Sequence, residues 1–582
     1  MSYIHRLLVV LSIIFISCSD NSEQETDLLL STTDLTFPQG GGSQVLLIQG
    51  GTDWSLTGVT DWCTASEVSG VGGKTFRVTI TATENQTPDQ RAATLTVVSG
   101  TVTKTVKVTQ ALTLLAAKSS YTALPAGGTI TVELKSKGEP SVRIGEGWIS
   151  RSVTDQTRAV SSRAEVFSVE ANYTGVKRTG TLIFTLDDVE EAVTIDQEPI
   201  AVPAPDRTGV ESDATALAAK IKLGWNLGNS LEAVGGETAW GNPLTTQAII
   251  NLVKDAGFDA IRIPCNWSSG YLWDDVSHTI KASWLNRVKT VVDYCVNNGM
   301  VAILNIHYDG GWLEVNPTYA KQKEVNEKQH ALWTQIAAFF RDYDEHLLFA
   351  GTNEVHVEGI YDNKLVTEEN HTVQQSFNQT FVNAVRATGG RNAYRNLIVQ
   401  AYNTNIELTA KLKMPTDKLP NRLMMEVHYY DPWEFAGSTT NAYWGEPYKD
   451  FGVTAWGGQE SYADAKFASL KSNFVDKGIP VILGEYGANR HSMTNENMIN
   501  SRAYYLEYIT RVAKNNGAVP FYWDNGGMGN GDTADQFGIF DRKNLRIFDQ
   551  PAVDALVRGA TKGAYPFISG CAFLFQYLNA KS

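Results

Sequence analysis

Eight short apolar runs, each followed by a stretch with helical spacing, constrain the fold of this 582-residue chain more than any other feature. Runs of strand length that are apolar throughout are typical of parallel strands buried on both faces. Several of the helical stretches end on glycine, as helices commonly do. Strand and helix in this alternation predict an α/β fold, a (β/α)8 TIM barrel over residues 215–563. The runs are 223–227, 260–264, 301–306, 347–352, 397–401, 424–427, 481–483 and 519–522.

An open, doubly wound sheet is the competing architecture for such a pattern. It would usually carry a glycine-rich phosphate loop after its first strand. Residues 224–229, Gly-Trp-Asn-Leu-Gly-Asn, lack the G-x-G-x-x-G spacing of that loop. The barrel is therefore the favoured prediction.

Two of the apolar runs end in a glutamate. Glu354 follows Asn353 at the end of the fourth run, and Glu485 lies at the end of the seventh. In a barrel, residues that follow the strands meet at the carboxyl-terminal rim, where active sites of this fold lie. A strand-end glutamate taken alone is more simply a solvated residue. Two of them facing one cleft indicate glycoside hydrolysis, in which one carboxyl protonates the leaving oxygen while the other attacks the anomeric carbon.

Other polar and aromatic side chains follow the strands at the same rim. Packing does not account for them, because the interior of a barrel is filled by apolar residues. We expect them to line the cleft, and they are Arg262, Asn305, His307, His428, Tyr430, Trp523, Asp524 and Asn525. The loops after strands also carry tryptophans that could stack on sugar rings, although some of them are expected to be structural; they are Trp267, Trp273, Trp312, Trp433, Trp444 and Trp456. Trp284 and Trp333 lie within helical stretches and are predicted core residues.

Residues 28–198 contain a tandem duplication. Three residues of the first half recur 87 positions later, so that Pro38, Arg91 and Gln110 match Pro125, Arg178 and Gln197 (125 − 38, 178 − 91 and 197 − 110). Alternating valine, threonine and isoleucine between turn residues predict antiparallel strands and two small immunoglobulin-like β-sandwiches, 28–111 and 112–198. A proline-rich linker, 199–214, leads into the barrel. The duplicated segments resemble BACON domains, which implies a position in front of the catalytic domain of an exported polysaccharide-degrading enzyme.

The first 18 residues have the pattern of an export signal. A basic pair precedes the apolar core 7–16, and Ser17 and Cys18 follow where a lipoprotein signal is cleaved and lipidated. The segment resembles a bacterial lipoprotein signal, which implies a lipid anchor on Cys18, attachment to the outer membrane and a place on the cell surface. The acidic stretch 19–27 is then a flexible tether. The alternatives are an uncleaved membrane anchor and a plain secretory signal.

The role predicted for the two sandwiches follows from that anchor. They are spacers that hold the barrel away from the membrane, with glycan binding as the less favoured role. Tryptophan in so small a domain is more often packed in the core than exposed to sugar.

Composition excludes several classes of partner. The formal net charge is −14 and no basic stretch offsets it, which argues against nucleic acid. A hydrophobic content of 43% with 19% charged residues is typical of globular proteins, and a neutral substrate fits this charge best. The cysteines after position 18 lack metal-binding spacing, so free and mostly buried thiols are expected at Cys63, Cys265, Cys295 and Cys571.

At the rim residues the chain resembles glycoside hydrolase family 5, the cellulase family of clan A, from Lys222 to about Gly559. The resemblance implies that Glu354 is the acid/base and Glu485 the nucleophile. It implies a supporting and substrate-binding set made of Arg262, His307, Asn353, His428, Tyr430, Trp523, Asn229 and Trp312. Three motifs, 224–229, 309–312 and 523–526, are similar to subfamily 4, whose members cut β-1,4-glucans including xyloglucan and mixed-linkage glucan.

The expected activity is therefore that of a retaining endo-β-1,4-glucanase, a monomer that hydrolyses plant β-glucans (cellulose-like, mixed-linkage glucan or xyloglucan) without metal or organic cofactor. Glu485 should be ionised beside Arg262 and Tyr430, and its charge should raise the pKa of Glu354. A carboxyl separation of about 5 Å would mean retention, and one of roughly 6.5 Å or more inversion. Asn353 is expected to bond the sugar 2-hydroxyl.

Three other functions stay open at this point. A β-mannanase would use the same catalytic frame, and a non-catalytic surface glycan-binding protein could use the same scaffold. A metal-dependent hydrolase could use His307, His428 and Asp524, although ligands of such sites usually lie closer together in sequence. The apolar tail, 564–582, is explained by none of these functions.

Overall fold

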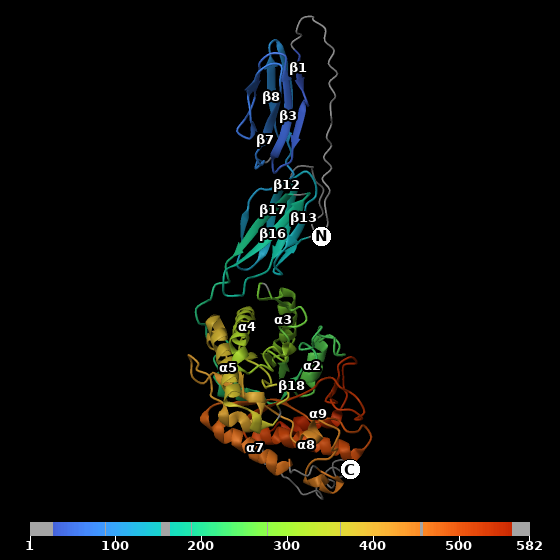
Figure 1. Ribbon diagram of the computed structural model, residues 1–582. Coiled ribbons are helices and arrows are strands. Elements are labelled where there is room, and N and C mark those ends of the chain that lie inside the picture. Colours follow the sequence, from blue (N-terminus) through green and yellow to red (C-terminus); the bar gives the residue numbers. More distant parts are fainter. Residues whose placement is uncertain are drawn as a thin grey trace.

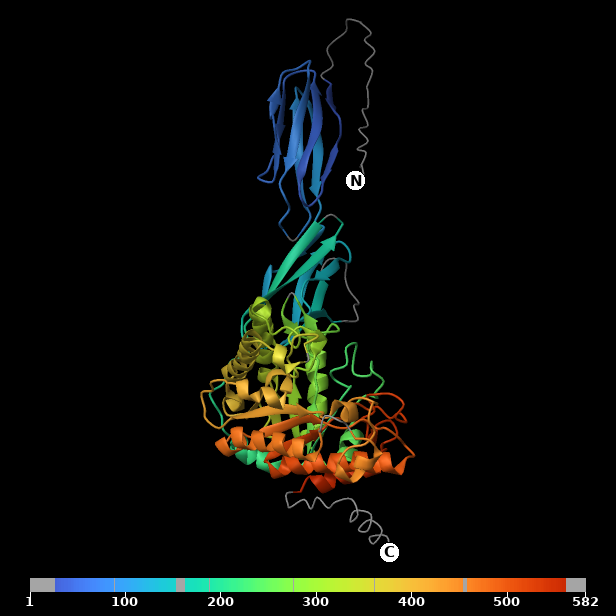
Figure 2. The same ribbon diagram turned by 60° about the horizontal axis from the view of Figure 1, so that its bottom comes forward.

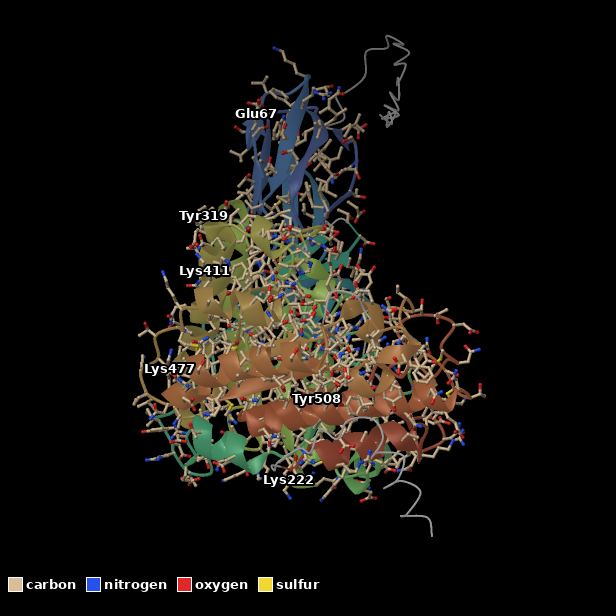
Figure 3. The ribbon with its side chains drawn as sticks, turned by 90° about the horizontal axis from the view of Figure 1, so that it is seen from below. Glu67, Lys222, Tyr319, Lys411, Lys477 and Tyr508 are labelled. Atoms are coloured by element: carbon tan, nitrogen blue, oxygen red, sulfur yellow. The ribbon has the colours of Figure 1, made fainter. Side chains whose placement is uncertain are left out.

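The computed structural model describes residues 27–87, 89–152, 163–187, 189–275, 277–360, 362–453 and 458–561. Two β-sandwiches stand end to end above a larger α/β body, so the molecule is elongated (Figure 1, Figure 2). Seen from below with side chains drawn, Lys222, Lys477 and Tyr508 lie on the broad body and Glu67 lies on the far sandwich (Figure 3). Within the described ranges, no helix is long and apolar enough to cross a membrane. Residues 1–18 with Cys18, most of the tether, Trp456, Cys571 and the tail 564–582 lie outside the described residues.

The C-terminal body is a closed parallel barrel, which confirms the predicted fold. Its eight strands pair in chain order, and the last pairs with the first. Residues along these strands are buried almost throughout, because helices cover one face and barrel-filling side chains cover the other. The strands are β18 (Gly224–Asn226), β19 (Ala260–Ile263), β22 (Val301–Asn305), β23 (Leu347–Ala350), β24 (Leu397–Gln400), β25 (Leu423–Tyr429), β26 (Val481–Tyr486) and β27 (Ala518–Tyr522).

Helices surround this barrel and turn their apolar stripes toward it. They are α2 (Gln247–Asp255), α3 (Ala282–Val296), α4 (Tyr319–Phe339), α5 (Glu368–Ala387), α7 (Glu460–Asn473), α8 (Glu496–Asn515) and α9 (Gln550–Gly559). In α4, Trp333 packs against Phe349 and Phe381 with ring centroids 5.6 and 4.6 Å away. Trp284 in α3 is also buried, so both tryptophans are core residues, as predicted.

Short elements lie in the loops that follow the strands and at the opposite end of the barrel. Helix α6 (Trp433–Ala436) follows β25, and two hairpins follow β19 and β27. The hairpins are β20 (Trp273–Asp274) with β21 (Thr279–Ile280) and β28 (Phe540–Asp541) with β29 (Arg546–Ile547). At the amino-terminal end of the strands, α1 (Ala214–Lys220) buries Leu217 among strand residues such as Ile303 and Ile398 and so closes the barrel floor.

Each β-sandwich has two sheets around its own apolar core. The first comprises β1 (Leu28–Leu30), β2 (Asp34–Phe37), β3 (Gly42–Gly50), β4 (Trp54–Thr57), β5 (Cys63–Ala65), β6 (Ser69–Gly70), β7 (Thr75–Ala82), β8 (Arg91–Ser99) and β9 (Val102–Gln110). The second comprises β10 (Leu114–Ala116), β11 (Ser120–Ala123), β12 (Gly128–Ser136), β13 (Ser141–Ile144), β14 (Ile149–Arg151), β15 (Arg163–Val169), β16 (Arg178–Leu186) and β17 (Val189–Gln197).

One feature of the sandwiches differs from the prediction of purely antiparallel strands. β2 pairs with β9 in parallel, and β11 pairs with β17 in parallel. In each copy the first stretch of chain pairs in one sheet and then crosses to the other, where it runs alongside the last strand. The prediction was wrong at these edges because strand-like alternation does not reveal a change of sheet.

An arginine and a glutamine that recur in both copies form a polar clamp, which in the first copy consists of Arg91 and Gln110. The Gln110 amide donates to the carbonyls of Pro38 and Gln39 at 3.0 Å and of Thr83 at 2.8 Å. Its Oε1 accepts a hydrogen bond from Arg91 Nε at 2.9 Å. One buried side chain therefore satisfies several main-chain carbonyls that have no strand partner.

The second copy repeats this clamp. Gln197 accepts from Arg178 Nε at 2.7 Å and donates to the carbonyls of Leu124 at 2.7 Å and Glu170 at 2.9 Å. The Arg178 guanidinium lies 4.1 Å from the ring centroid of Trp148, which is buried. Trp148 is thus a packing residue of the sandwich, in line with the structural role favoured for tryptophan in these domains.

The cysteines that the structure describes are unpaired. Cys63 lies in the core of the first sandwich, and Cys265 and Cys295 lie in the barrel; all three are buried. The prediction of free, buried thiols is confirmed for these three.

Replacing Gln110 with alanine should destabilise the first sandwich by about 2 kcal/mol, because three carbonyls would each lose one of their donors and Arg91 Nε would lose its acceptor. Calorimetric unfolding of the full chain should show one transition moved to lower temperature. The matched control is Gln86→Ala, which removes an exposed glutamine from the same sandwich. Equal unfolding of the two variants would contradict the role given to the clamp.

Candidate active site

A fully buried arginine stands at the centre of the barrel's carboxyl-terminal rim. Arg262, from β19, donates through Nη1 to Glu485 Oε1 at 2.8 Å and to Asn226 Oδ1 at 3.0 Å. Its Nη2 donates to Asn353 Oδ1 at 2.8 Å, and its Nε lies 2.9 Å from Glu426 Oε1. The guanidinium is thus hydrogen-bonded through Nη1 and Nη2 and ion-paired through Nε, so the planar group fixes the side chains around it.

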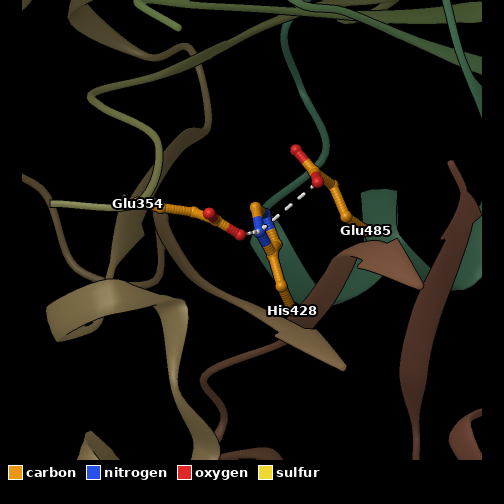
Figure 4. A group of neighbouring side chains, drawn as sticks. All are labelled: Glu354, His428 and Glu485. Carbon is orange, nitrogen blue, oxygen red and sulfur yellow. Dashed lines mark hydrogen bonds and ion pairs between the residues drawn. The ribbon is translucent and has the colours of Figure 1, made fainter. Parts of the chain in front are cut away.

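The two predicted catalytic glutamates face each other across His428 (Figure 4). His428 Nδ1 lies 2.6 Å from Glu354 Oε1 and 3.7 Å from Glu485 Oε2. Carboxylate oxygens of the two glutamates lie within 4.8 Å of each other. The Glu354 side chain is 35% exposed and that of Glu485 only 7%, so the first is accessible to solvent and the second is nearly buried.

Glu485 has both oxygens held in place. Oε1 accepts from Arg262, and Oε2 accepts from the Tyr430 hydroxyl at 3.1 Å. Tyr430 lies just after β25, and Glu485 lies within β26, so neighbouring strands position donor and acceptor. These contacts are the ones expected for the predicted nucleophile.

A third carboxylate, Glu426, lies beneath this pair, and the sequence analysis did not single it out. Its Oε1 is 3.3 Å from His428 Nε2, and its Oε2 accepts from Gln400 Nε2 at 2.7 Å. A Cβ on Gly484 would lie 1.9 Å from Glu426 Oε1, so glycine there makes room for the carboxylate. The signal in the sequence is the spacing, because residues two apart in a strand, here Glu426 and His428, point to the same side.

Burial and charge set the protonation of the two histidines in opposite directions. Burial alone would lower the pKa of His428, but Glu485, Glu354 and Glu426 together raise it to about 10. The pKa of His307 falls well below its usual value, because it is buried and lies near the positive charges of Arg262 and His428. At neutral pH the site therefore holds one imidazolium, at His428, and one neutral imidazole, at His307.

The predicted rise in the pKa of Glu354 is wrong for the free protein. Burial favours such a rise, but the hydrogen bond and charge of His428, with the charge of Arg262, lower the pKa below its ordinary value. For Glu485 burial raises the pKa, and the nearby negative charges of Glu354 and Glu426 act in the same direction against His428 and Arg262. The cause is a contact between Glu354 and an imidazolium, which the sequence pattern does not reveal.

His307 and Trp523 stack on each other at the carboxyl-terminal rim of the barrel. Their rings stack with centroids 5.8 Å apart and planes 5° from parallel. Asn305 Nδ2 lies 3.3 Å from His307 Nδ1, and Asn305 Oδ1 accepts from the Cys265 N–H at 3.1 Å. Three of the predicted rim residues, Asn305, His307 and Trp523, are thus brought together.

Trp312 is oriented by a buried aspartate in the loop after β22. Its Nε1 donates to Asp309 Oδ2 at 2.8 Å, and Asp309 also accepts from the N–H groups of Trp267, Ser268 and Ser269. Asp309 therefore ties the loop after β19 to the loop after β22. Trp312 itself remains half-buried, with part of its ring accessible.

The backbone of Asn229 forms hydrogen bonds with Glu232 and Asn242 rather than with the two predicted catalytic glutamates. Its backbone has a positive φ of 54°, its N–H donates to the buried carboxylate of Glu232, and its carbonyl accepts from Asn242 at 2.9 Å. These bonds fix the loop after β18. A contact between Asn229 and substrate stays a prediction.

The predicted sugar-stacking tryptophans separate into two groups. Trp267 and Trp444 have no exposed surface, and their indole N–H groups donate to the carbonyls of Asn305 and Gly458, both at 2.7 Å. These two are structural members of that set, because these rim loops fold inward and bury their large rings. Trp433 is 60% exposed, and Trp273 is half-buried. Trp456 lies outside the described residues.

Another buried acid, Glu314, stands beside the acid/base side of the site. Its Oε2 accepts from the Tyr308 N–H at 2.8 Å, and its Oε1 lies 3.4 Å from Asn353 Nδ2. Burial and the charge of Glu354 raise its pKa to about 8, so it is neutral at pH 7. Glu314 follows no strand directly, and the motif around Trp312 gave no reason to select it.

Both carboxylate oxygens of Asp524 are occupied by hydrogen bonds, and Asp524 does not belong to the one group with metal-like spacing in the described residues. Its Oδ2 accepts from Trp225 Nε1 at 3.1 Å and from the Ile539 N–H at 3.0 Å, and its Oδ1 accepts from Gly526 and Arg542. In the part of the chain that the structure describes, the one group with metal-like spacing is Glu354, His428 and Glu485. Two carboxylates around a protonated imidazole describe a proton-handling site.

Comparison with known proteins agrees with this geometry. Residues 226–529 match the family described as Cellulase (glycosyl hydrolase family 5), and residues 52–111 and 139–198 match the BACON family, described as "Putative binding domain, N-terminal". The chain is 33% identical over 575 residues to the xyloglucan-specific endo-beta-1,4-glucanase BoGH5A of Bacteroides ovatus, covering 95% of each chain. It is 38% identical over 369 residues to endoglucanase A of Paenibacillus barcinonensis, covering 60% of this chain and 90% of that one.

A solved structure gives the same result. The Bacteroides ovatus GH5 xyloglucanase in complex with a XXXG heptasaccharide has a TM-score of 0.57 and 31% identity with this chain. The match covers 92% of this chain and 100% of the other. The similarity thus includes the sandwich region as well as the barrel.

Ring-nitrogen NMR shifts of histidine-labelled protein should show His428 protonated between about pH 6 and pH 8 and His307 neutral over the same range. The raised pKa of His428 stabilises the fold fully below about pH 6.5, and this contribution is lost as the pH rises toward about 10. Glu354→Gln should lower the pKa of His428, because a charge and an acceptor are removed. Deprotonation of His428 near pH 6.5 in the unsubstituted protein would contradict the arrangement.

Proposed function

Because the chain belongs to glycosyl hydrolase family 5, we propose that it is a retaining endo-β-1,4-glucanase, which cleaves internal bonds of plant β-glucans. The observation that carries this proposal is the gap of less than 4.8 Å between carboxylate oxygens of Glu354 and Glu485. Retaining enzymes hold their carboxyl groups about 5 to 5.5 Å apart, whereas inverting enzymes leave about 6.5 Å or more for a water molecule. The cleft here is too narrow between the two groups for inversion.

The first chemical step is attack by Glu485 on the anomeric carbon. Hydrogen bonds from Arg262 and Tyr430 hold its two oxygens, which fixes the direction of the attacking lone pair. The bond to the leaving oxygen breaks as the glycosyl ester forms. Glu354, on the exposed side of the gap, is placed to protonate that oxygen.

The proton that the leaving oxygen takes is held between Glu354 and His428. In the free enzyme it resides on His428, 2.6 Å from Glu354 Oε1. Formation of the ester removes the charge of Glu485, and this loss lowers the pKa of His428, so its proton passes to Glu354 as Glu354 protonates the leaving oxygen. Glu354 is then ionised and accepts a proton from the water that hydrolyses the ester, and this proton returns to His428.

The substrate groups around the scissile bond have evident partners. Asn353 has its Oδ1 occupied by Arg262, which orients Nδ2 as a donor for the sugar 2-hydroxyl. Trp312 and Trp433, on the loops after β22 and β25, expose ring surface suited to stacking on sugar rings. Xyloglucan is the polymer that we assign as preferred substrate, since the relative that matches nearly the whole chain carries that specificity in its name.

Purified protein without residues 1–18 should release reducing ends from xyloglucan faster than from mixed-linkage glucan, carboxymethylcellulose or glucomannan. Proton NMR of the first products should show the β-anomer, because double displacement retains configuration. Initial formation of the α-anomer would exclude the retaining mechanism. Faster release from glucomannan would identify a β-mannanase instead.

Glu354→Gln and Glu485→Gln should each lower kcat/KM on the polymer by roughly a hundredfold to ten-thousandfold. The two variants should differ on a dinitrophenyl cellobioside, whose leaving group needs no proton. There Glu354→Gln should still form the glycosyl-enzyme, seen as an added mass by mass spectrometry, whereas Glu485→Gln should not. Adduct formation by Glu485→Gln would contradict its assignment as nucleophile.

We also propose that the protein is an outer-membrane lipoprotein displayed on the cell surface, with Cys18 lipidated. Support comes from the sequence of residues 1–18, and the elongated arrangement of the sandwiches suits a spacer between membrane and enzyme (Figure 1). Cys18→Ala should abolish incorporation of labelled palmitate and move the protein out of the membrane fraction, with kcat unchanged. Ser17→Ala, which keeps the cysteine, is the matched control. Palmitate incorporation by Cys18→Ala would contradict the assignment.

A further inference from the structure

The second sandwich is in direct contact with the barrel, at three places. The Gly147 N–H donates to Asp274 Oδ2 at 3.0 Å. Glu170 accepts a hydrogen bond from the N–H of Ala282, the first residue of α3. The ring of Tyr173 packs edge-on against Phe339, the last residue of α4, with centroids 5.4 Å apart. These contacts place the sandwich against the ends of two barrel helices and one rim hairpin.

The duplication allows these contact residues to be compared with their counterparts in the first sandwich. β5 and β14 hold the same place in their copies, so Gly147, two residues before β14, matches Asp61, two residues before β5. Glu170 matches Thr83, since the main-chain carbonyl of each accepts from the clamp arginine of its own copy.

Tyr173 matches Gln86 by the same reasoning. Tyr173 lies between Asn172 and Thr174, and Gln86 lies between Asn85 and Thr87, which form the same asparagine turn. At all three places the copies differ, although the turn and the clamp are the same in both. The three first-copy counterparts are exposed, whereas Glu170 and Tyr173 are half-buried; Gly147 is exposed like its counterpart but donates a hydrogen bond to the barrel. The difference between the copies therefore coincides with the surface that meets the barrel.

Gly147 is needed for the closest of these contacts. A Cβ at this position would lie 2.5 Å from Asp274 Oδ2. The other oxygen of Asp274 accepts from the Ser277 N–H at 2.7 Å and closes the turn of the hairpin β20–β21. One carboxylate therefore joins the sandwich to the hairpin and shapes the hairpin itself.

The hairpin continues this contact toward the cleft. Trp273, next to Asp274, has Lys328 Nζ 6.0 Å from its ring centroid. The same ammonium lies 4.6 Å from the ring centroid of Trp312, the half-buried tryptophan at the cleft. Cation–π contacts on both rings hold Lys328 between them. A continuous series of contacts thus runs from Gly147 through Asp274, Trp273 and Lys328 to Trp312.

We propose that the second sandwich is a positioning element of the glycan-binding cleft, which holds the hairpin β20–β21 and, through Lys328, the ring of Trp312. Gly147, Glu170 and Tyr173 are its docking residues. The first sandwich has no such role, because its matching residues face solvent. The inference rests on the proposed function, since Trp312 must contact the polysaccharide for its position to affect binding.

The test replaces the docking residues with those of the first copy, as Gly147→Asp, Glu170→Thr and Tyr173→Gln in the full chain. These residues already occur in a sandwich of the same fold, and Gly147→Asp sets a second carboxylate against Asp274. The matched control makes the reciprocal changes in the first sandwich, Asp61→Gly, Thr83→Glu and Gln86→Tyr. Hydrogen exchange and steady-state kinetics are measured on both variants and on the unsubstituted protein.

The docking variant should show faster amide exchange over residues 272–282 and a KM for polysaccharide raised roughly three- to tenfold, the loss expected for one displaced aromatic contact. Its kcat on the polymer and its rate on a dinitrophenyl cellobioside should match those of the unsubstituted protein. Lys328→Met should raise KM in the same way without faster exchange. The reciprocal control should change neither quantity.

Unchanged exchange over residues 272–282 in the docking variant would overturn the docking, and faster exchange with an unchanged KM would overturn the positioning role. Both outcomes presuppose an active unsubstituted enzyme. Failure of the unsubstituted protein to hydrolyse any β-glucan would instead refute the proposed function, so the two failures are distinguishable.

Discussion

The buried guanidinium of Arg262 is the constraint on which the site depends. A charge with no exposed surface is tolerated only where anions and acceptors surround it, since removing a partner leaves an uncompensated charge. Arg262 therefore requires the carboxylates of Glu426 and Glu485 and the amide oxygens of Asn226 and Asn353. These partners come from β18, β25 and β26 and from the loop after β23. Pairing one cation thus fixes both Glu485 and Asn353, the residue before Glu354.

The same requirement explains why protonation in the site is collective. Arg262 and His428 face three carboxylates, Glu354, Glu426 and Glu485, so the imidazole stays protonated although burial opposes it. Its proton lies on the bond to Glu354, the one carboxylate of the three with substantial exposure. The proton on His428 therefore both balances the charge of the carboxylates and is placed for transfer to Glu354. Under the proposed mechanism, ester formation at Glu485 shifts this balance and releases the proton toward Glu354.

Much of this arrangement could be predicted because it follows from position along a strand. Buried strands appear in the sequence as apolar runs, and eight such runs alternating with helices predict the closed barrel. Glu354 and Glu485 lie at the ends of two of these runs, which predicts that they share one rim. Loop folding is not readable in this way, which is why the sequence could not tell that Trp267 and Trp444 are buried whereas Trp433 is exposed. The pKa direction at Glu354 failed for a related reason. It depends on the 2.6 Å contact with His428, and sequence places both residues at the rim without fixing their distance.

The tandem sandwiches provide a comparison within one chain that separates folding from function. Both copies need the clamp, because main-chain carbonyls at the end of each sandwich lack strand partners, so Arg91 and Gln110 recur as Arg178 and Gln197. A residue that served only the sandwich fold would be free to recur as well. Gly147 and Tyr173 do not recur, and both contact the barrel, so a requirement outside the sandwich accounts for them. A spacer would need length alone; specific contacts with a rim hairpin imply that the second copy shapes the enzyme it carries.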